Sequence, residues 1–292
     1  MQGKIIKQIS NDYTVKADKE YICKARGKFR KMEVSPLVGD NVIFDEKENY
    51  ILEILPRKNE LQRPSVANVD KAIIIASLKE PDFDTNLLDK LLTIITYNNV
   101  TPIIIFTKID LLTMDEQKAF KEYFEYYKKI GYDCYINTEL DKIKKIFRNQ
   151  VSVFTGQSGA GKSTLLNNLD KGLKLETGEI SKSLNRGKHT TRHTSLLEIE
   201  GGLVADTPGF SSLSFNEMTP SLIRDNFIEF NMYREDCKYR DCMHYKEDEC
   251  AIKEKVKNNQ ILKSRYDNYI NFITRGWFYD SWIVFKNNEW HW

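Results

Sequence analysis

The chain has 292 residues, of which 41% are hydrophobic and 29% are charged, and its formal net charge is +2. This composition can fill more than one hydrophobic core, and it excludes a disordered chain and a uniformly basic one. The first residues turn polar quickly and no apolar run approaches the roughly 20 residues that span a bilayer, so we expect a cytoplasmic protein with no membrane segment.

Residues 1–65 are predicted to form a β domain. Strand-like runs separated by turn signals lie at residues 4–9, 13–16, 21–25 and 41–45. Many short strands in so few residues favour a small closed barrel, because closure removes exposed strand edges. The basic side chains of this stretch fit either a solvated strand-and-turn face or a surface that faces nucleic acid. They are Lys24, Arg26, Lys28, Arg30 and Lys31.

Residues 66–218 alternate between strand and helix patterns, which predicts a doubly wound α/β domain. Strands are expected at residues 72–76, 103–106, 132–136, 151–155 and 203–205. Helices are expected after Asp84, from the capping box of Thr113 and Glu116 to about residue 130, at 139–147 and at 162–168. Ligands of such a domain bind beyond the carboxyl ends of its strands.

The tetrapeptide TKID follows the second of these strands. The carboxylate of Asp110 could accept hydrogen bonds from the N1–H and 2-amino groups of guanine, which adenine does not offer, and the Lys108 stem would cover the base. The motif is similar to the NKxD sequence of GTPases, but Thr107 replaces an asparagine whose amide could support the loop, so we expect a modest affinity. A chance tetrapeptide is the alternative, and the strand end argues against it. The predicted guanine-binding residues are Thr107, Lys108, Ile109 and Asp110.

The segment GQSGAGKS fits the phosphate-loop pattern GxxxxGK[ST] and lies between a strand and a helix. Its backbone N–H groups would surround phosphate oxygens at the helix N-terminus. Lys162 would reach the β and γ phosphates, and the Ser163 hydroxyl would ligate Mg²⁺. The alternative, a chance glycine turn, does not explain the flanking strand and helix. The predicted phosphate-binding residues are Gly156, Gln157, Ser158, Gly159, Ala160, Gly161, Lys162, Ser163 and Thr164.

The sequence DTPG follows the apolar strand at residues 203–205. Asp206 is placed to hold Mg²⁺ through water, and the Gly209 N–H could contact the γ phosphate and respond to its loss. An ordinary turn is the alternative, and the phosphate loop upstream favours the functional interpretation.

Residues 219–292 carry a Cys/His cluster, a charged helical stretch near 251–273 and an aromatic tail. The cluster consists of Cys237, Cys242, His244 and Cys250. Thiolate and imidazole ligands suit tetrahedral zinc, and four protein ligands make the site structural; an iron–sulfur centre and unmetallated thiols are the alternatives.

The remaining cysteines and the basic residues of this region have simpler interpretations. Cys23 and Cys134 lie in strand patterns and are predicted to be small core residues. The basic side chains of the helical stretch fit an RNA-facing surface or a solvated helix face equally well. They are Lys253, Lys255, Lys257, Lys263 and Arg265.

The order of the motifs is unusual, because TKID precedes the phosphate loop, whereas in ordinary GTPases the guanine motif follows it. The chain therefore looks circularly permuted. With the barrel, the Cys/His cluster and the segments RPSVANVD (63–70), GKHTTRHT (187–194) and DTPGF, it resembles the family of GTPases that depend on the small ribosomal subunit, RsgA (also called YjeQ). The resemblance covers essentially the whole chain.

This resemblance implies a multidomain α/β protein: an OB-fold RNA-binding barrel at 1–65, a circularly permuted P-loop GTPase domain at 66–218 and a mainly helical zinc-binding domain at 219–292. It also implies a GTPase that the small ribosomal subunit stimulates, that contacts the rRNA of that subunit and that acts late in its assembly. The expected cofactors are one structural Zn²⁺ and Mg²⁺ with GTP, and we expect a monomer.

The catalytic residue is assigned through the same resemblance. Phe210 stands where small GTPases often carry a glutamine that orients the attacking water, and it cannot do so. The resemblance gives this role to His189, although a histidine that packs or contacts RNA is the alternative. Thr190 or Thr191 would ligate Mg²⁺ in the GTP state. Competing functions are an RNA-binding module whose nucleotide only sets its conformation, and a P-loop ATPase, against which Asp110 argues.

Overall fold

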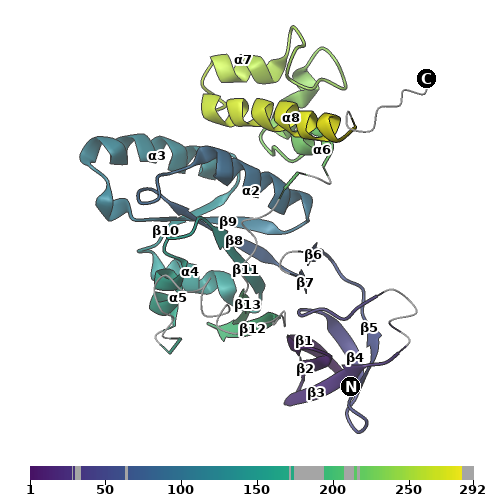
Figure 1. Ribbon diagram of the computed structural model, residues 1–292. Helices are drawn as coiled ribbons and strands as arrows, with labels where there is room; N and C mark the ends of the chain where they lie inside the picture. Colours follow the sequence, from purple (N-terminus) through teal and green to yellow (C-terminus); the bar gives the residue numbers. More distant parts are fainter. Residues whose placement is uncertain are drawn as a thin grey trace, which may run out of the picture.

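The structure is a computed structural model that describes residues 1–27, 29, 34–62, 65–170, 172–173, 194–206, 214–215 and 218–284. Figure 1 shows three parts stacked along the molecule: a β barrel at the bottom, an α/β unit in the middle and a helical unit at the top. Among the helices of these ranges, none combines the length and the apolar character needed to cross a membrane.

The N-terminal part is a closed barrel, as the sequence predicts. Its strands are β1 (Gln2–Ile9), β2 (Asp12–Lys16), β3 (Glu20–Ala25), β4 (Asn41–Asp45) and β5 (Tyr50–Ile54). They are ordered β1-β2-β3-β5-β4, and a β1–β4 pairing closes the ring. Alternate side chains point inward, and Val15, Cys23 and Phe44 are fully buried. Strand β5 was not predicted, although closure depends on it.

The α/β unit contains the predicted strands, with bounds shifted by one or two residues. Its elements are β8 (Lys71–Ser77), α2 (Thr85–Tyr97), β9 (Thr101–Thr107), the 3-10 helix η1 (Ile109–Leu111), α3 (Met114–Lys129), β10 (Asp133–Ile136), α4 (Leu140–Phe147), β11 (Val151–Gly156), α5 (Lys162–Leu169), β12 (Thr194–Ile199) and β13 (Gly202–Asp206). The sheet order is β10-β9-β8-β11-β13-β12, and β12 is the antiparallel member.

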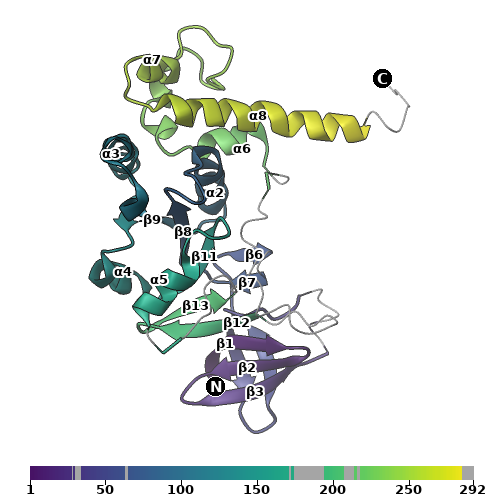
Figure 2. The same ribbon diagram turned by 60° about the vertical axis from the view of Figure 1, so that its left-hand side comes forward.

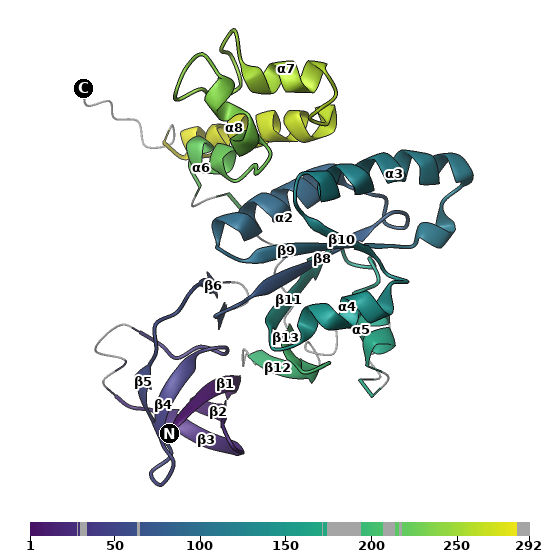
Figure 3. The ribbon, with the colours of Figure 1, turned by 180° about the vertical axis from the view of Figure 1, so that it is seen from behind.

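Both faces of this sheet are covered, which explains the unbroken apolar runs of its strands. Figures 1 and 3 show α2 and α3 on one face and α4 and α5 on the other. Along β8, Ile74 joins the core under α2 and α3, whereas Ile73 and Ile75 join the core under α4 and α5. The predicted helix starts are confirmed: Asp84 caps α2, and Thr113 and Glu116 form a capping box at α3.

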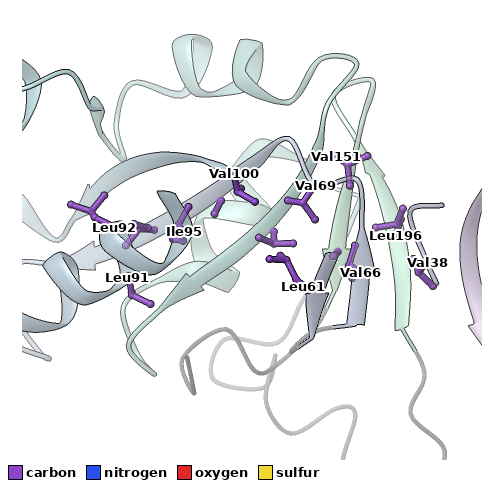
Figure 4. Packing of buried hydrophobic residues seen from close by; sticks show 14 of the residues in the cluster. Val38, Leu61, Val66, Val69, Leu91, Leu92, Ile95, Val100, Val151 and Leu196 are labelled. Atoms are coloured by element: carbon purple, nitrogen blue, oxygen red, sulfur yellow. The ribbon is translucent and has the colours of Figure 1, made fainter. Parts of the chain in front are cut away.

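A short hairpin and β12 connect the barrel with the α/β unit. The hairpin consists of β6 (Glu60–Gln62) and β7 (Ser65–Ala67). Figure 4 shows Leu61 and Val66 of this hairpin in the same apolar cluster as Val151 of β11 and Leu196 of β12. Strand β12 pairs with β1, so one sheet runs from β10 through the α/β unit into the barrel. No pattern in the sequence indicated this continuity.

The C-terminal part contains α6 (Pro220–Asp225), the 3-10 helices η4 (Phe230–Met232) and η5 (Arg234–Asp236), α7 (Ala251–Lys257) and α8 (Lys263–Val284). Figure 2 shows α8 lying across α6 and above α2. The helical stretch expected near 251–273 consists of two helices, α7 and α8. The chain turns between them at Asn259, whose φ of 54° is left-handed.

Arg265 corrects the expectation about the basic side chains of this stretch. Its side chain is fully buried, so it belongs neither to an RNA-facing surface nor to a solvated face. Its guanidinium binds both carboxylate oxygens of Glu229, at 2.7 and 3.0 Å, and Asp89 of α2 at 2.7 Å. Burial alone would lower the pKa of Arg265, but these two carboxylates raise it well above its ordinary value. The ion pair with Asp89 joins the C-terminal part to the α/β unit, whereas the pair with Glu229 lies within the C-terminal part.

Candidate functional site

The TKID segment and the GQSGAGKS loop meet at one edge of the sheet. Strand β8 lies between β9 and β11 and is parallel to both, with Ser77 opposite Thr107 and Ile75 opposite Gly156. The carboxyl ends of β9 and β11 therefore point the same way, although TKID precedes the phosphate loop in the chain. This is the edge where ligands of doubly wound sheets bind.

A direct contact joins the two motifs. The Thr107 hydroxyl donates a 2.7 Å hydrogen bond to the carbonyl oxygen of Ala160 in the phosphate loop, and both residues are buried. The sequence interpretation treated Thr107 as a loss of loop support, whereas here its hydroxyl supports the phosphate loop.

The phosphate loop needs its glycines for their backbone conformations. Gly156, Gly159 and Gly161 have φ values of 131°, 78° and 94°. A Cβ on Gly156 would lie 2.3 Å from the carbonyl oxygen of Ile75, so no larger residue fits there. Gly161 directly precedes α5, and the first N–H groups of that helix face the loop without intrahelical partners. This arrangement suits phosphate.

The side chains of this loop differ in exposure. Lys162 donates hydrogen bonds to the carbonyl oxygens of Gly156 and Gln157, at 3.0 and 2.8 Å, and burial lowers its pKa. A phosphate anion would offset that burial cost. Ser163 is buried at the start of α5, whereas Ser158 and Thr164 are exposed.

The other TKID residues form the rim of the site. Lys108 has a left-handed φ of 61°, and its ammonium group contacts the carbonyl oxygen of Glu80. Ile109 is half-buried, and Asp110 is exposed on the 3-10 helix η1.

Two further segments beside the site had no clear signature in the sequence. Pro81, in the loop after β8, lies against the phosphate loop, because a Cβ on Gly159 would be 3.8 Å from its Cδ. In the sequence, only the position of Pro81 after the strand β8 could have indicated this contact. Asn137 follows β10 and donates from its backbone to Phe106 at 2.9 Å. Its buried side-chain oxygen has no hydrogen-bond partner among the described residues.

The remaining predicted nucleotide residues are only partly placed. Asp206 ends β13, which is parallel to β11 and directly beside it, so its backbone reaches the same edge of the sheet. Its side chain lies outside the described part of the chain, as do His189, Thr190, Thr191 and Gly209. Their assigned roles remain predictions.

The predicted metal ligands converge in the C-terminal part. One ligand atom from each of Cys237, Cys242, His244 and Cys250 lies within 4.8 Å of the others. The Nδ1 atom of His244 is 3.6 Å from the Cys237 sulfur and 3.4 Å from the Cys250 sulfur, and these two sulfurs are 4.0 Å apart. Tetrahedral Zn–S bonds would separate two sulfurs by about 3.8 Å. All cysteines described are free, and Cys23 and Cys134 are buried core residues, as predicted.

The environment of the Cys/His cluster is compatible with a bound cation. Burial lowers the pKa of His244 to about 4, so its ring is neutral at pH 7, as a metal ligand must be. Burial also raises the pKa of Cys242 to about 12, and a bound cation would reverse this shift by stabilising the thiolate. Tyr266 and Tyr269 of α8 hold the ligand loop by donating hydrogen bonds to the carbonyl oxygens of His244 and Met243, at 2.7 and 2.5 Å.

Comparisons with known proteins agree with this arrangement. Residues 54–216 match the family described as RsgA GTPase, and residues 2–51 match the RsgA N-terminal domain. The chain is 50% identical over 281 residues to the small ribosomal subunit biogenesis GTPase RsgA 2 of Oceanobacillus iheyensis, covering 93% of this chain and 96% of that one. It is 48% identical over 282 residues to the small ribosomal subunit biogenesis GTPase RsgA of Geobacillus kaustophilus, with the same coverage.

Two solved structures are similar along nearly the full length. The crystal structure of YloQ, described as a circularly permuted GTPase, has a TM-score of 0.79 and 38% identity, and the match covers 94% of each chain. The crystal structure of YjeQ from Thermotoga maritima has a TM-score of 0.82 and 34% identity, and the match covers 94% of this chain and 97% of that one.

Proposed function

Because this chain belongs to the RsgA family of circularly permuted GTPases, we propose that it hydrolyses GTP during late assembly of the small ribosomal subunit. In this proposal it binds that subunit and its rRNA, and the subunit stimulates hydrolysis to GDP and phosphate. The observation that carries the proposal is the hydrogen bond from Thr107 to Ala160, which brings the guanine motif and the phosphate loop into one site.

The described residues support the proposed nucleotide binding. The Asp110 carboxylate would accept hydrogen bonds from the guanine edge, and its exposure leaves it open to the base. The N–H groups of loop residues 156–164 would bind the phosphates, and Lys162 would exchange its two carbonyl partners for phosphate oxygens. Asn137 offers an unpaired amide oxygen at the same edge, next to the base-binding motif.

Hydrolysis requires a water in line with the γ phosphate. We assign the orientation of this water to His189 and the contact with the γ phosphate to the Gly209 N–H. Ser163, Asp206 and either Thr190 or Thr191 would hold Mg²⁺, which neutralises charge on the phosphates when it is bound. The residues of the protein therefore position the reactants and stabilise charge, and none forms a covalent bond to the phosphate.

We assign the Cys/His cluster to a single structural Zn²⁺. Three thiolates and one imidazole complete a tetrahedral shell, so no coordination position remains for a substrate water. The cluster would fold the loops of residues 219–292 around the metal, while residues 1–65 form the RNA-binding barrel and residues 66–218 the GTPase domain. A protein with this task works in the cytoplasm, and we propose that it acts as a monomer.

The decisive experiment compares GTP and ATP hydrolysis with and without purified small subunits. The proposal predicts turnover of GTP alone and a marked increase when the subunits are added. Equal turnover of ATP would contradict the role of Asp110.

A second candidate function is an RNA-binding module in which the nucleotide only sets the conformation, and Phe210 in place of a water-orienting glutamine favours it. His189→Ala separates the two functions. The GTPase proposal predicts that this variant binds GTP normally and loses subunit-stimulated turnover. Undiminished stimulated turnover would remove His189 from the mechanism, and absence of turnover in the unaltered protein with subunits would support the second function.

A further inference from the structure

Strand β1 pairs with strands of both the barrel and the α/β unit. Residues Gln2, Gly3 and Lys4 pair with β4 and close the barrel. Lys7 and Gln8 pair instead with β12 of the α/β unit. The change of partner coincides with a register shift between Ile5 and Lys7 in the pairing with β2. Such irregularities bend a strand and redirect it, and here the end of β1 turns from β4 toward β12 while it stays paired with β2.

The end of β1 reaches the place where both catalytic segments are attached. Gln8 lies opposite Thr194, the first residue of β12, and Thr194 is also the last residue of the segment GKHTTRHT. The next residue, Ser195, lies between Lys7 of β1 and Asp206 of β13. Asp206 begins DTPG. One barrel strand therefore lies beside the attachment points of both segments to which we assigned the γ phosphate and the water.

The contact between β1 and β12 is small, so a single substitution should weaken it. Within the described part of the chain, two residue pairs join these strands, whereas five join β12 to β13. One ion pair adds to it: Lys16 of β2 contacts Glu198 of β12, with the two side chains 43% and 61% exposed. Below them, Leu196 is buried in the same core as Val38 and Val66. The barrel thus holds β12 through a short pairing, one charge pair and a shared core.

We propose that the barrel positions the catalytic segments through β12, so that docking of the barrel on RNA raises GTP turnover through the β1–β12 contact. In this mechanism Lys16 and Glu198 are positioning residues that contact neither nucleotide nor water. The inference rests on the proposed function, because it explains how subunit binding could act on hydrolysis. The competing route is through the C-terminal part, which Arg265 fastens to α2.

The test is a charge swap across the contact. Glu198→Lys places two like charges together, which destabilises a cross-strand contact. We expect the kcat at saturating small subunit to fall about threefold to fivefold, with basal kcat, KM for GTP and subunit affinity unchanged. Lys16→Glu should act similarly, and the double variant K16E/E198K should restore stimulation. A defect caused by lost RNA contacts of Lys16 would not be rescued in this way.

The matched control is Glu200→Lys. Glu200 lies in the turn of the same hairpin, two residues after Glu198, and pairs with Lys144 of α4 instead of the barrel, with the side chains 27% and 33% exposed. The substitution Glu200→Lys breaks an ion pair of the same hairpin that does not involve the barrel, so stimulation by the small subunit should stay normal. Three results would each overturn the proposal. They are normal stimulation of Glu198→Lys by the small subunit, no recovery of stimulation in the double variant, and an equal loss of stimulation in Glu200→Lys.

Hydrogen exchange supplies a readout that does not need hydrolysis. With a non-hydrolysable GTP analogue, subunit binding should slow exchange of the backbone amides of residues 194–199 in the unaltered protein and in K16E/E198K, but not in Glu198→Lys. If subunits fail to stimulate even the unaltered protein, the proposed function is wrong, and the exchange data still decide whether the barrel acts on β12. Identical exchange with and without subunits overturns the inference.

Discussion

The hydrogen bond between Thr107 and Ala160 can be removed with almost no change of shape, by Thr107→Val. The hydroxyl donates at 2.7 Å and the residue is 2% exposed, so water does not replace the lost donor in the folded site. A buried carbonyl left without a partner costs about 1–3 kcal/mol. Since each 1.4 kcal/mol is tenfold in an equilibrium constant, the cost corresponds to roughly a 5- to 150-fold change.

The free-energy cost of the lost hydrogen bond can appear either in nucleotide affinity or in the free energy of unfolding. If the phosphate loop relaxes in the free protein to hydrate the Ala160 carbonyl, the nucleotide must restore the loop, and affinity for both GTP and GDP falls. If the loop stays in place, the free energy of unfolding falls instead. Calorimetric titration of nucleotide and denaturant unfolding should therefore show losses that add up to this range, while Thr107→Ser should keep most of the bond.

Thr155 of β11 provides the matched control. It is also 2% exposed, but its hydroxyl has no hydrogen-bond partner among the described residues. Thr155→Val makes the same change without breaking a bond and should leave affinity and stability unchanged or slightly improved. Wild-type affinity and stability in Thr107→Val, or an equal loss in Thr155→Val, would refute the role of this hydrogen bond.

Three further outcomes follow from the structure. Arg265→Met leaves two buried carboxylates without their cation and should lower the free energy of unfolding by about 3–5 kcal/mol in denaturant unfolding, whereas Lys263→Met, on the exposed face of the same helix, should change it little. A chelator should release one equivalent of zinc, detected by a colorimetric dye, and lower the melting temperature; absence of released metal would contradict the zinc assignment. Hydrogen bonds from the Thr113 N–H and from Lys79 lower the pKa of Glu116 from 4.5 to about 2. Its charge therefore stabilises the fold above pH 4.5, and this contribution is lost as the pH falls toward 2. The difference in melting temperature between Glu116→Ala and the unaltered protein should accordingly shrink between pH 7 and pH 3, and a constant difference would contradict the assignment.

Local patterns predicted most of the α/β unit, including the strand and helix on either side of the GQSGAGKS loop. Strand runs buried on both faces, the Asp84 cap and the capping box at Thr113 each depend on residues close in sequence, and all of them appear in the structure. The phosphate loop was predictable for the same reason, because its glycine conformations and its lysine lie within one short segment.

Features that depend on distant residues were not predictable. The pairing of β1 with β12 joins segments far apart in the chain, and neither strand carries a sign of its partner. Arg265 lies in a charged helical stretch where burial depends on Asp89 and Glu229, which come from other helices and loops. The turn at Asn259 was missed because asparagine adopts the left-handed conformation without the glycine or proline that usually marks a helix end.

The buried ion pair between Asp89 and Arg265 also has a consequence for the order of synthesis. The two residues are 176 positions apart, and a ribosome makes the chain from its N-terminus. The carboxylate on α2 therefore lacks its guanidinium partner until α8 has been made, and the surface that α8 will cover stays open for that time. A nascent chain interrupted before α8 would keep this charged, partly apolar surface exposed to proteases and chaperones, so α8 completes the surface of the central domain.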